Sequence, residues 1–347
     1  MRIIVTGGSG FIGSAFIRNA INKNHEIINI DCLTYAACQD NLRSISKHPN
    51  YFFKKTNIID QEEISRILYS HRPDKIIHFA AESHVDRSID SASEALQTNI
   101  IGTYVLLDAF TKYWIDMGKP ETYRFHHIST DEVFGNVING QKFTEETKYN
   151  PKNPYSASKA SSDHLVRAWS NTHQLPIVIT NCSNNYGPYQ FPEKLIPLTI
   201  LNILNNKIIP IYGNGKQIRD WIHVEDHVDA LLMILNDNKN NELYNIGTNG
   251  EQKNIDLVKR ICSLLDEKLN PKKSFINLIE FVKDRPGHDT HYAIDSQKLL
   301  NFYDWQPKYT VETGIKQTVD WYLNNQWWLD NLKDREGVGI RLGKSYS

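Results

Sequence analysis

The chain has 347 residues, 39 of them basic and 40 acidic, with a formal net charge of −1 at pH 7. It contains no block of like charge long enough for a nucleic-acid arm or a polybasic membrane anchor, so we expect neither partner. The length exceeds that of one ordinary domain and predicts a large domain with a smaller one beside it.

The first half of the chain alternates short β-rich runs with amphipathic stretches. Such alternation is typical of βαβ units, and it predicts an α/β fold built on a doubly wound parallel (Rossmann) sheet. The expected strands are residues 2–7, 26–31, 51–56, 74–81, 123–130 and 176–181.

The rhythm changes after residue 187, where prolines and glycines separate shorter elements. The clearest later helices are expected at 254–267 and 311–325, in a smaller α/β substrate-binding domain. Residues 221–235 and 242–247 again resemble a helix followed by a strand, so we expect the domains to interleave. We assign 1–180 plus about 218–247 to the Rossmann domain, and about 181–217 plus 248–347 to the smaller domain.

A glycine-rich turn follows the first predicted strand. Gly7, Gly10 and Gly13 stand in G-x-x-G-x-x-G spacing at the start of a helix, where the backbone can approach a pyrophosphate. Taken alone, the turn could equally be structural. Asp31 ends the second strand, where a carboxylate accepts the ribose hydroxyls of NAD and repels the extra phosphate of NADP. Together they predict an NAD-binding domain.

Tyr155 and Lys159 lie four residues apart in a stretch of helical periodicity, so their side chains share one face. Taken alone, the pair fits an ordinary exposed tyrosine and lysine. The pair follows a nucleotide-binding half and a strand that ends in Ser129-Thr130, and this context predicts that Tyr155 and Lys159 act as an acid–base pair. The ammonium should then lower the phenol pKa from its usual value of about 10.

Two adjacent carboxylates, Asp131 and Glu132, follow the strand that ends at Thr130. Hydride transfer alone needs no such pair, so we expect a further chemical step on the substrate. Burial and mutual repulsion could push the two pKa values apart. The alternative is a solvated loop.

The ordered set GGSGFIG, HFAAESHVDRS, TDE, YSASK and SNNYGP resembles the extended short-chain dehydrogenase/reductase group, and within it the dTDP-glucose 4,6-dehydratase family. The resemblance continues through PIYGNGKQIRDW and DRPGHD, and so covers nearly the whole chain. The TDE triplet discriminates, because related 4-epimerases usually carry small hydroxylated residues there. The resemblance implies an NAD-dependent hydro-lyase that makes dTDP-4-keto-6-deoxyglucose for rhamnose-type deoxysugar biosynthesis, and a homodimer.

The resemblance also implies catalytic roles. Tyr155, supported by Lys159, would take the proton of the carbon-4 hydroxyl, while Thr130 hydrogen-bonds that oxygen. Glu132 would remove the carbon-5 proton, and Asp131 would protonate the departing carbon-6 hydroxyl.

Binding residues follow from the same resemblance. For NAD they are Gly7, Gly10, Phe11, Ile12, Gly13, Asp31, Cys32, Leu33, Thr34, Asn57, Ile58, Ala80, Ala81, Thr98, Tyr155, Lys159 and Asn185. For the nucleoside-diphosphate glucose they are Ser83, Thr130, Asn184, Lys194, Leu195, Pro210, Tyr212, Arg219, Asn254, Asp284, Arg285 and His288. Lys194, Arg219 and Arg285 suit a diphosphate, although each alone could be a surface charge.

Several alternatives stay open. The substrate could be UDP- or CDP-glucose, and the same scaffold could serve a 4-epimerase, a decarboxylase or a catalytically silent NAD-binding regulator. His223 and His227 have the spacing of a metal pair but lack the zinc-protease pattern, so no metal is expected. Four scattered cysteines, no room for a signal peptide and no apolar run of roughly 20 residues predict a cytoplasmic protein.

Overall fold

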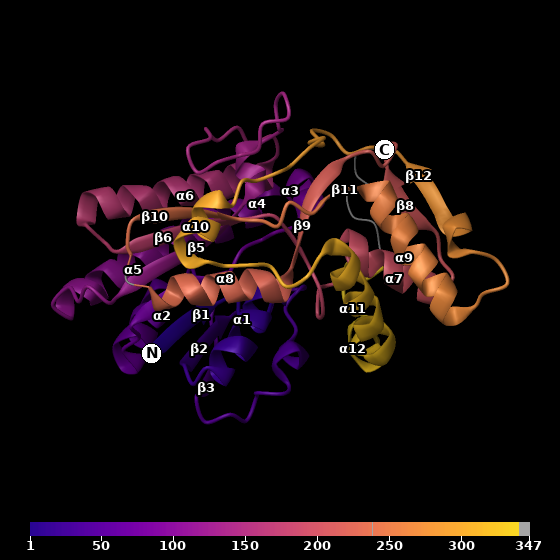
Figure 1. Cartoon of the computed structure of the whole chain (residues 1–347). Coiled ribbons are helices and arrows are strands. Elements are labelled where there is room, and N and C mark those ends of the chain that lie inside the picture. The colour runs from indigo at the N-terminus through magenta and orange to yellow at the C-terminus, as the bar shows by residue number, and fades with distance from the viewer. Residues whose placement is uncertain (238, 340–347) are drawn as a thin grey trace.

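The computed structural model describes residues 1–237 and 239–339, and its centre is a seven-stranded parallel sheet (Figure 1). The strand order is β10-β6-β5-β4-β1-β2-β3, so the direction of winding reverses between β1 and β4. The predicted doubly wound α/β fold is therefore confirmed. The strands are β1 (Arg2–Thr6), β2 (Glu26–Asp31), β3 (Tyr51–Lys55), β4 (Lys75–His78), β5 (Arg124–Thr130), β6 (Ile177–Cys182) and β10 (Glu242–Ile246).

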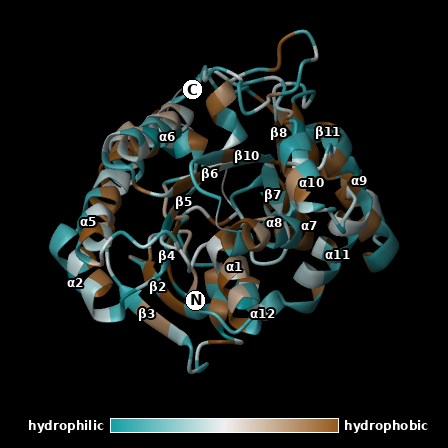
Figure 2. Cartoon of the chain, turned by 60° about the vertical axis from the view of Figure 1, so that its left-hand side comes forward, coloured by the Kyte–Doolittle hydropathy of each residue, from teal (hydrophilic) through white to brown (hydrophobic). Residues whose placement is uncertain are grey.

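Helices cover both faces of the sheet, and successive residues of one strand pack on opposite layers. Ile3 and Val5 of β1 join the core formed with α1 and α8, whereas Ile4 joins the core formed with α2, α5 and α6. The apolar strands thus lie between two helical layers (Figure 2). These helices are α1 (Phe11–Asn22), α2 (Gln61–His71), α5 (Thr103–Asp116), α6 (Pro154–His173) and α8 (Val224–Asn236).

A separate apolar core holds the smaller unit, at the right of Figure 1. Four helices pack there: α7 (Leu195–Leu204), α9 (Asn254–Leu269), α11 (Val311–Asn324) and α12 (Gln326–Leu332). The predicted helices at 254–267 and 311–325 are confirmed as α9 and α11. Two small sheets complete the unit, with strands β7 (Asn184–Tyr186), β8 (Ile209–Tyr212), β9 (Ile218–His223), β11 (Glu251–Lys253) and β12 (Ile279–Val282).

Short helical segments connect the larger elements. They are η1 (Gln39–Leu42), α3 (Val85–Asp90), α4 (Ala92–Ala95), the π-helical η2 (Leu96–Gly102), η3 (Asp131–Phe134), η4 (Phe275–Leu278) and α10 (Gln297–Tyr303). The division into two domains stays a prediction. Contacts cross it: α10, for example, packs on β10 and buries Leu299 in the core of the large sheet.

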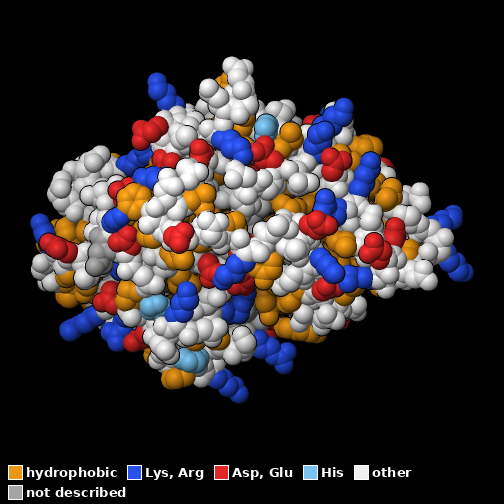
Figure 3. All heavy atoms as spheres, in the orientation of Figure 1, with side chains coloured by type: hydrophobic (Ala, Val, Ile, Leu, Met, Phe, Trp, Pro, Cys, Tyr) orange, Lys and Arg blue, Asp and Glu red, His pale blue; other side chains and the backbone are white. Residues whose placement is uncertain are grey.

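Sequence signals fix the start of α6, the helix that carries Tyr155 and Lys159. The Asn153 side chain accepts a hydrogen bond from the Ser156 N–H at 2.9 Å and completes a capping box, and Pro154 occupies the first turn. Acidic and basic side chains are interspersed over the face shown in Figure 3. Within the described residues, no helix combines the length and apolar character that crossing a bilayer requires.

Candidate active site

The glycine-rich turn packs so closely that side chains would not fit. Gly7 has a φ of +69°, and a Cβ there would lie 2.6 Å from the backbone nitrogen of Ala80. A Cβ on Gly13 would lie 2.4 Å from the Gly7 carbonyl oxygen. The turn therefore brings bare backbone and the N-terminus of α1 to the edge of a cavity, an arrangement that fits a pyrophosphate.

Asp31 ends β2 beside this turn and is 7% exposed. Its carboxylate accepts the Ser9 N–H at 2.9 Å and the Leu33 N–H at 2.8 Å. Burial raises the pKa of Asp31, and these two N–H groups act to lower it. Both backbone bonds fix the carboxylate at the cavity wall, where a ribose diol could bind.

A cavity of about 350 Å³ runs from the glycine turn to α6. With one exception, every residue predicted to bind NAD lines it, from Gly7, Gly10, Phe11, Ile12 and Gly13 through Asp31, Cys32, Thr34, Asn57, Ile58, Ala80, Ala81 and Thr98 to Tyr155, Lys159 and Asn185. Leu33 lies outside the lining and contributes its N–H to Asp31. The glycine cradle and this lining fit a dinucleotide.

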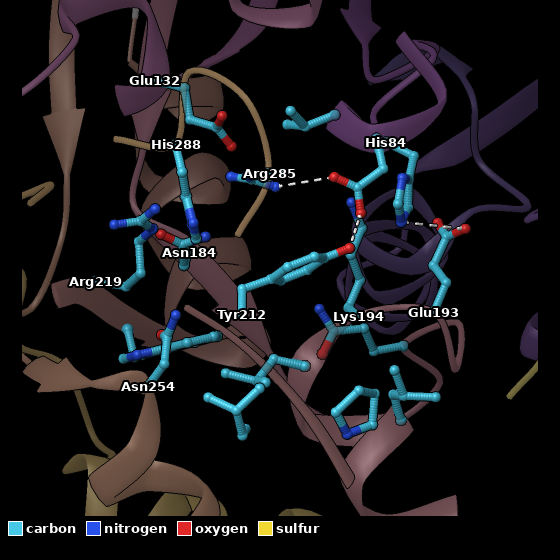
Figure 4. A pocket seen from close by; sticks show the side chains of 18 of the residues that line it. His84, Glu132, Asn184, Glu193, Lys194, Tyr212, Arg219, Asn254, Arg285 and His288 are labelled. Atoms are coloured by element: carbon cyan, nitrogen blue, oxygen red, sulfur yellow. Dashed lines mark hydrogen bonds and ion pairs between the residues drawn. The ribbon is translucent and has the colours of Figure 1, made fainter. Parts of the chain in front are cut away.

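A second cavity, of about 190 Å³, opens between α3 and the smaller unit (Figure 4). It is lined by nine of the residues predicted to bind the sugar nucleotide: Asn184, Lys194, Leu195, Pro210, Tyr212, Arg219, Asn254, Arg285 and His288. Ser83 and Thr130 line the first cavity instead. Asp284 lines neither cavity, and it contacts His288 Nδ1 at 2.6 Å.

The two cavities adjoin, because several residues line both of them. These shared residues are Glu132, Asn184, Asn185, Gln190, Glu193 and Lys194. Glu132 therefore lies where a molecule in one cavity would meet a molecule in the other. Thr130, Asp131, Tyr155 and Lys159 line the first cavity near this junction.

Asp131 is 1% exposed, and its Oδ2 is buried without a hydrogen-bond partner. The Thr130 hydroxyl lies 3.4 Å from Asp131 Oδ1 and accepts the Glu132 N–H at 3.3 Å. Burial, followed by the nearby charges of Glu132 and Asp220, raises the pKa of Asp131 well above its ordinary value. The raised pKa favours a protonated Asp131 carboxyl next to Glu132, as a general acid requires.

Tyr155 does not show the predicted lowering of its pKa. Burial and the charge of Glu132 raise the pKa of Tyr155 well above its ordinary value, whereas a hydrogen bond with Thr130 acts to lower it. The Lys159 ammonium donates to the Ile128 carbonyl oxygen at 2.8 Å. The predicted net lowering of the Tyr155 pKa is therefore wrong for this structure, because burial of the phenol dominates.

Three cations reach the second cavity from different segments. Arg219 is buried and donates to the carbonyl oxygens of Ile218 and Asp289, at 2.8 Å each. The Arg285 guanidinium lies 3.5 Å from an oxygen of Asp86, and Lys194 donates to the Ser83 carbonyl at 2.9 Å. Of these contacts, only that of Arg285 involves an anionic side chain, so the cations could also bind a diphosphate.

The sequence interpretation missed several polar residues of the site. Glu82 lines the first cavity, and burial with the charge of Glu94 raises its pKa to about 7. Asp86 accepts the Tyr212 hydroxyl at 2.6 Å on the second cavity's wall. Glu193 accepts the Tyr35 hydroxyl at 3.2 Å. Glu82 and Asp86 belong to the HFAAESHVDRS motif, so that motif could have indicated them.

The two histidines of the HVEDH stretch have protein partners. His223 Nε2 lies 3.0 Å from Gln317 Oε1, and His227 Nδ1 lies 2.8 Å from Asn185 Oδ1. No group of three or more metal-ligating side chains occurs among residues 1–237 and 239–339. His227 thus orients Asn185, which lines both cavities.

Comparison with known proteins identifies the family. A family model described as GDP-mannose 4,6 dehydratase matches residues 4–318. The curated dTDP-glucose 4,6-dehydratase 1 of Escherichia coli (strain K12) is 53% identical over an alignment of 345 positions that covers 96% of each chain. The chain belongs to the dTDP-glucose 4,6-dehydratase family.

Solved structures of a dehydratase and of an epimerase share this fold. The dTDP-glucose 4,6-dehydratase of Bacillus anthracis, crystallised in complex with NAD, is 42% identical with a TM-score of 0.85, over 96% of this chain and 99% of that one. The UDP-glucose 4-epimerase of Thermotoga maritima, solved with UDP-glucose, is 28% identical with a TM-score of 0.83, over 94% and 100%. The scaffold is thus common to dehydratases and epimerases, and side chains must separate them.

The protonation of Asp131 makes stability depend on pH. Because the pKa of Asp131 is raised in the folded state, its favourable contribution is complete below the unfolded pKa and is lost as pH rises through the folded pKa. The Asp131→Asn variant has no proton to lose at this position. The free energy of unfolding of the variant should therefore increase relative to that of the wild type as pH rises from 4 to 8. Urea unfolding at several pH values measures this. A difference that stays constant over that range would contradict burial of a neutral Asp131.

Proposed function

We propose that this chain dehydrates dTDP-glucose to dTDP-4-keto-6-deoxyglucose by internal transfer of hydrogen through bound NAD. The observation that carries the proposal is the Asp131-Glu132 pair where the two cavities meet. One carboxyl of the pair is buried with a raised pKa, and the other faces both cavities. A pair of this kind suits an acid and a base on one substrate.

Each catalytic side chain has one role in the proposed reaction. Tyr155 takes the proton of the carbon-4 hydroxyl, and Thr130 hydrogen-bonds the same oxygen, so a ketone forms at carbon 4. That ketone acidifies the proton on carbon 5, which Glu132 removes. Asp131 donates its proton to the departing carbon-6 hydroxyl, and water leaves. Reprotonation of carbon 5 completes the 4-keto-6-deoxy sugar.

NAD, when bound, supplies the hydride acceptor for carbon 4 and the hydride donor for carbon 6. Gly7, Gly10 and Gly13 would admit its pyrophosphate, and Asp31 would accept a ribose hydroxyl. Asp31 also favours NAD over NADP, because a carboxylate repels the 2′-phosphate. NADP in the purified protein, identified after denaturation, would contradict this assignment.

The second cavity would take the nucleoside diphosphate. Arg219, Arg285 and Lys194 converge on it from β9, the 283–289 loop and the start of α7 (Figure 4). Guanidinium groups pair with phosphate oxygens through two parallel hydrogen bonds, and an ammonium adds a point charge. The glucosyl group would then reach the shared junction at Glu132.

Separation of the half-reactions tests the catalytic pair. Glu132→Gln and Asp131→Asn should each slow water loss by about 10²- to 10⁴-fold, the usual contribution of one acid or base. Oxidation at carbon 4 should survive, so absorbance of the reduced cofactor and a 4-keto-glucose nucleotide should accumulate in rapid-quench experiments. Tyr155→Phe serves as the control, because it should abolish both signals. A Glu132→Gln variant that dehydrates at the wild-type rate would remove Glu132 from the mechanism.

The nucleotide base is tested by competition. UDP-glucose lacks one methyl group on the base, and a single methyl contact is worth only about 1 kcal/mol. We expect kcat/KM for dTDP-glucose to exceed that for UDP-glucose by about five- to tenfold, and CDP-glucose to be poorer. If kcat/KM for UDP-glucose or CDP-glucose equals or exceeds that for dTDP-glucose, the preference for dTDP is wrong. Inversion at carbon 4 without loss of water would favour an epimerase.

We also propose a homodimer in the cytoplasm. Leu96, Ile101 and Tyr104 are exposed to 44%, 43% and 39% along η2 and α5, and Tyr104 packs on Trp169 of α6. These helices form an apolar face that a second copy could cover. A monomer by sedimentation at micromolar concentration would contradict the dimer.

The four cysteines are free thiols, which suits the reducing environment of the cytoplasm. Recovery of the protein from a secreted fraction would contradict a cytoplasmic location.

A further inference from the structure

A buried carboxylate behind the active site has no role in the reaction described above. Asp163 lies on α6, one turn after Lys159, with 0% of its surface exposed. Residues four apart on a helix share a face, so Asp163 and Lys159 both point toward the sheet. A charge removed so completely from water is costly unless its surroundings compensate it.

Several side chains surround the Asp163 carboxylate. Its Oδ1 lies 3.1 Å from His127 Nε2, and its Oδ2 accepts the hydroxyls of Ser129 at 2.8 Å and Tyr149 at 2.9 Å. Burial acts to raise the pKa of Asp163, but His127, Lys159 and Ser129 together lower it below its ordinary value. The carboxylate is therefore held ionised inside the protein.

The Lys159 ammonium lies close to the Asp163 carboxylate, with His127 between them. Lys159 Nζ lies 3.5 Å from the same His127 Nε2 that contacts Asp163. Burial lowers the pKa of His127 to about 4, so the imidazole between the two charges is neutral near pH 7. His127 Nε2 thus lies within 3.1 Å of the Asp163 carboxylate and 3.5 Å of the Lys159 ammonium, so the two charges share one ring nitrogen as neighbour.

Asp163 is the carboxylate that supports the charge of Lys159. Burial lowers the pKa of Lys159, and Asp163 followed by Cys182 opposes that lowering. Burial raises the pKa of Cys182 to about 12, so the thiol is neutral. The groups around the pair are His78 of β4, His127 and Ser129 of β5, Cys182 of β6 and Tyr149 ahead of α6. Tyr155 lies one turn before Lys159 on α6.

We propose that Asp163 is a positioning residue of the reaction, whose carboxylate keeps the Lys159 ammonium charged and in place to assist Tyr155. Through Ser129 the same carboxylate fixes the end of β5, from which Thr130, Asp131 and Glu132 continue. This inference rests on the proposed function, because it assumes that Tyr155 accepts a proton. It adds a residue that lines neither cavity and acts from behind Ser129, which lines the first.

The pH dependence of the first half-reaction tests the proposal. Asp163→Asn keeps the size of the side chain and removes its charge, so Lys159 should stabilise the Tyr155 phenolate less. The acid limb of carbon-4 oxidation, followed through the reduced cofactor with dTDP-glucose, should move up by about one pH unit, a tenfold loss on that limb. Tyr149→Phe is the matched control, because it removes one donor to Asp163 and leaves the charge. If the acid limb of the Asp163→Asn variant has the same midpoint pH as that of the wild type, and the rate is reduced equally at every pH, the proposal is overturned.

Thermal unfolding gives a test that needs no substrate. Asp163→Asn should lower the unfolding midpoint, and Lys159→Met should at least halve that loss, since the ammonium is then already absent. An undiminished loss in the Lys159→Met background would assign Asp163 to hydrogen bonding alone and overturn the proposal. If Asp163→Asn alone does not fold, the double variant Asp163→Asn/Lys159→Met should fold. A double variant that also fails to fold would overturn the proposal. Wild-type enzyme inactive on dTDP-glucose would refute the proposed function and leave this stability test decisive for Asp163.

Discussion

The site depends on the parallel arrangement of the central sheet, which brings the carboxyl ends of its strands to one edge. The glycine turn after β1, Asp31 at the end of β2, Ala80 after β4 and Thr130 at the end of β5 all meet there. The winding direction reverses between β1 and β4, and a crevice opens at such a point. Segments more than a hundred residues apart thereby line one cavity.

Burial then gives these side chains their chemistry. Removal from water favours the neutral form of a carboxyl group, so Asp131 can hold a proton beside Glu132. The same desolvation raises the pKa of Tyr155 and lowers that of Lys159, which opposes the formation of a phenolate and of an ammonium. Compensation must come from fixed charges in the surroundings, and Asp163 is one such charge. The protein therefore needs buried partners as well as catalytic groups.

Local sequence was sufficient to predict the parts of the site that local geometry determines. The glycine spacing, Asp31 at a strand end and the Tyr155–Lys159 spacing all follow from the periods of strands and helices. Contacts between distant segments could not be predicted in this way. Asp86 meets Tyr212 and Arg285 across 126 and 199 residues, and Asp163 meets Ser129 across 34. The pKa of Tyr155 was predicted in the wrong direction because its burial depends on several elements at once.

The central claim is that one substrate molecule is oxidised at carbon 4 and reduced at carbon 6 in a single active site. Wild-type enzyme should be incubated in ordinary water with dTDP-glucose that carries deuterium at carbon 4, and the product analysed by nuclear magnetic resonance. The account predicts a 4-keto-6-deoxy product with the deuterium at carbon 6. Deuterium released to water, or a product that keeps its carbon-6 hydroxyl, would contradict it.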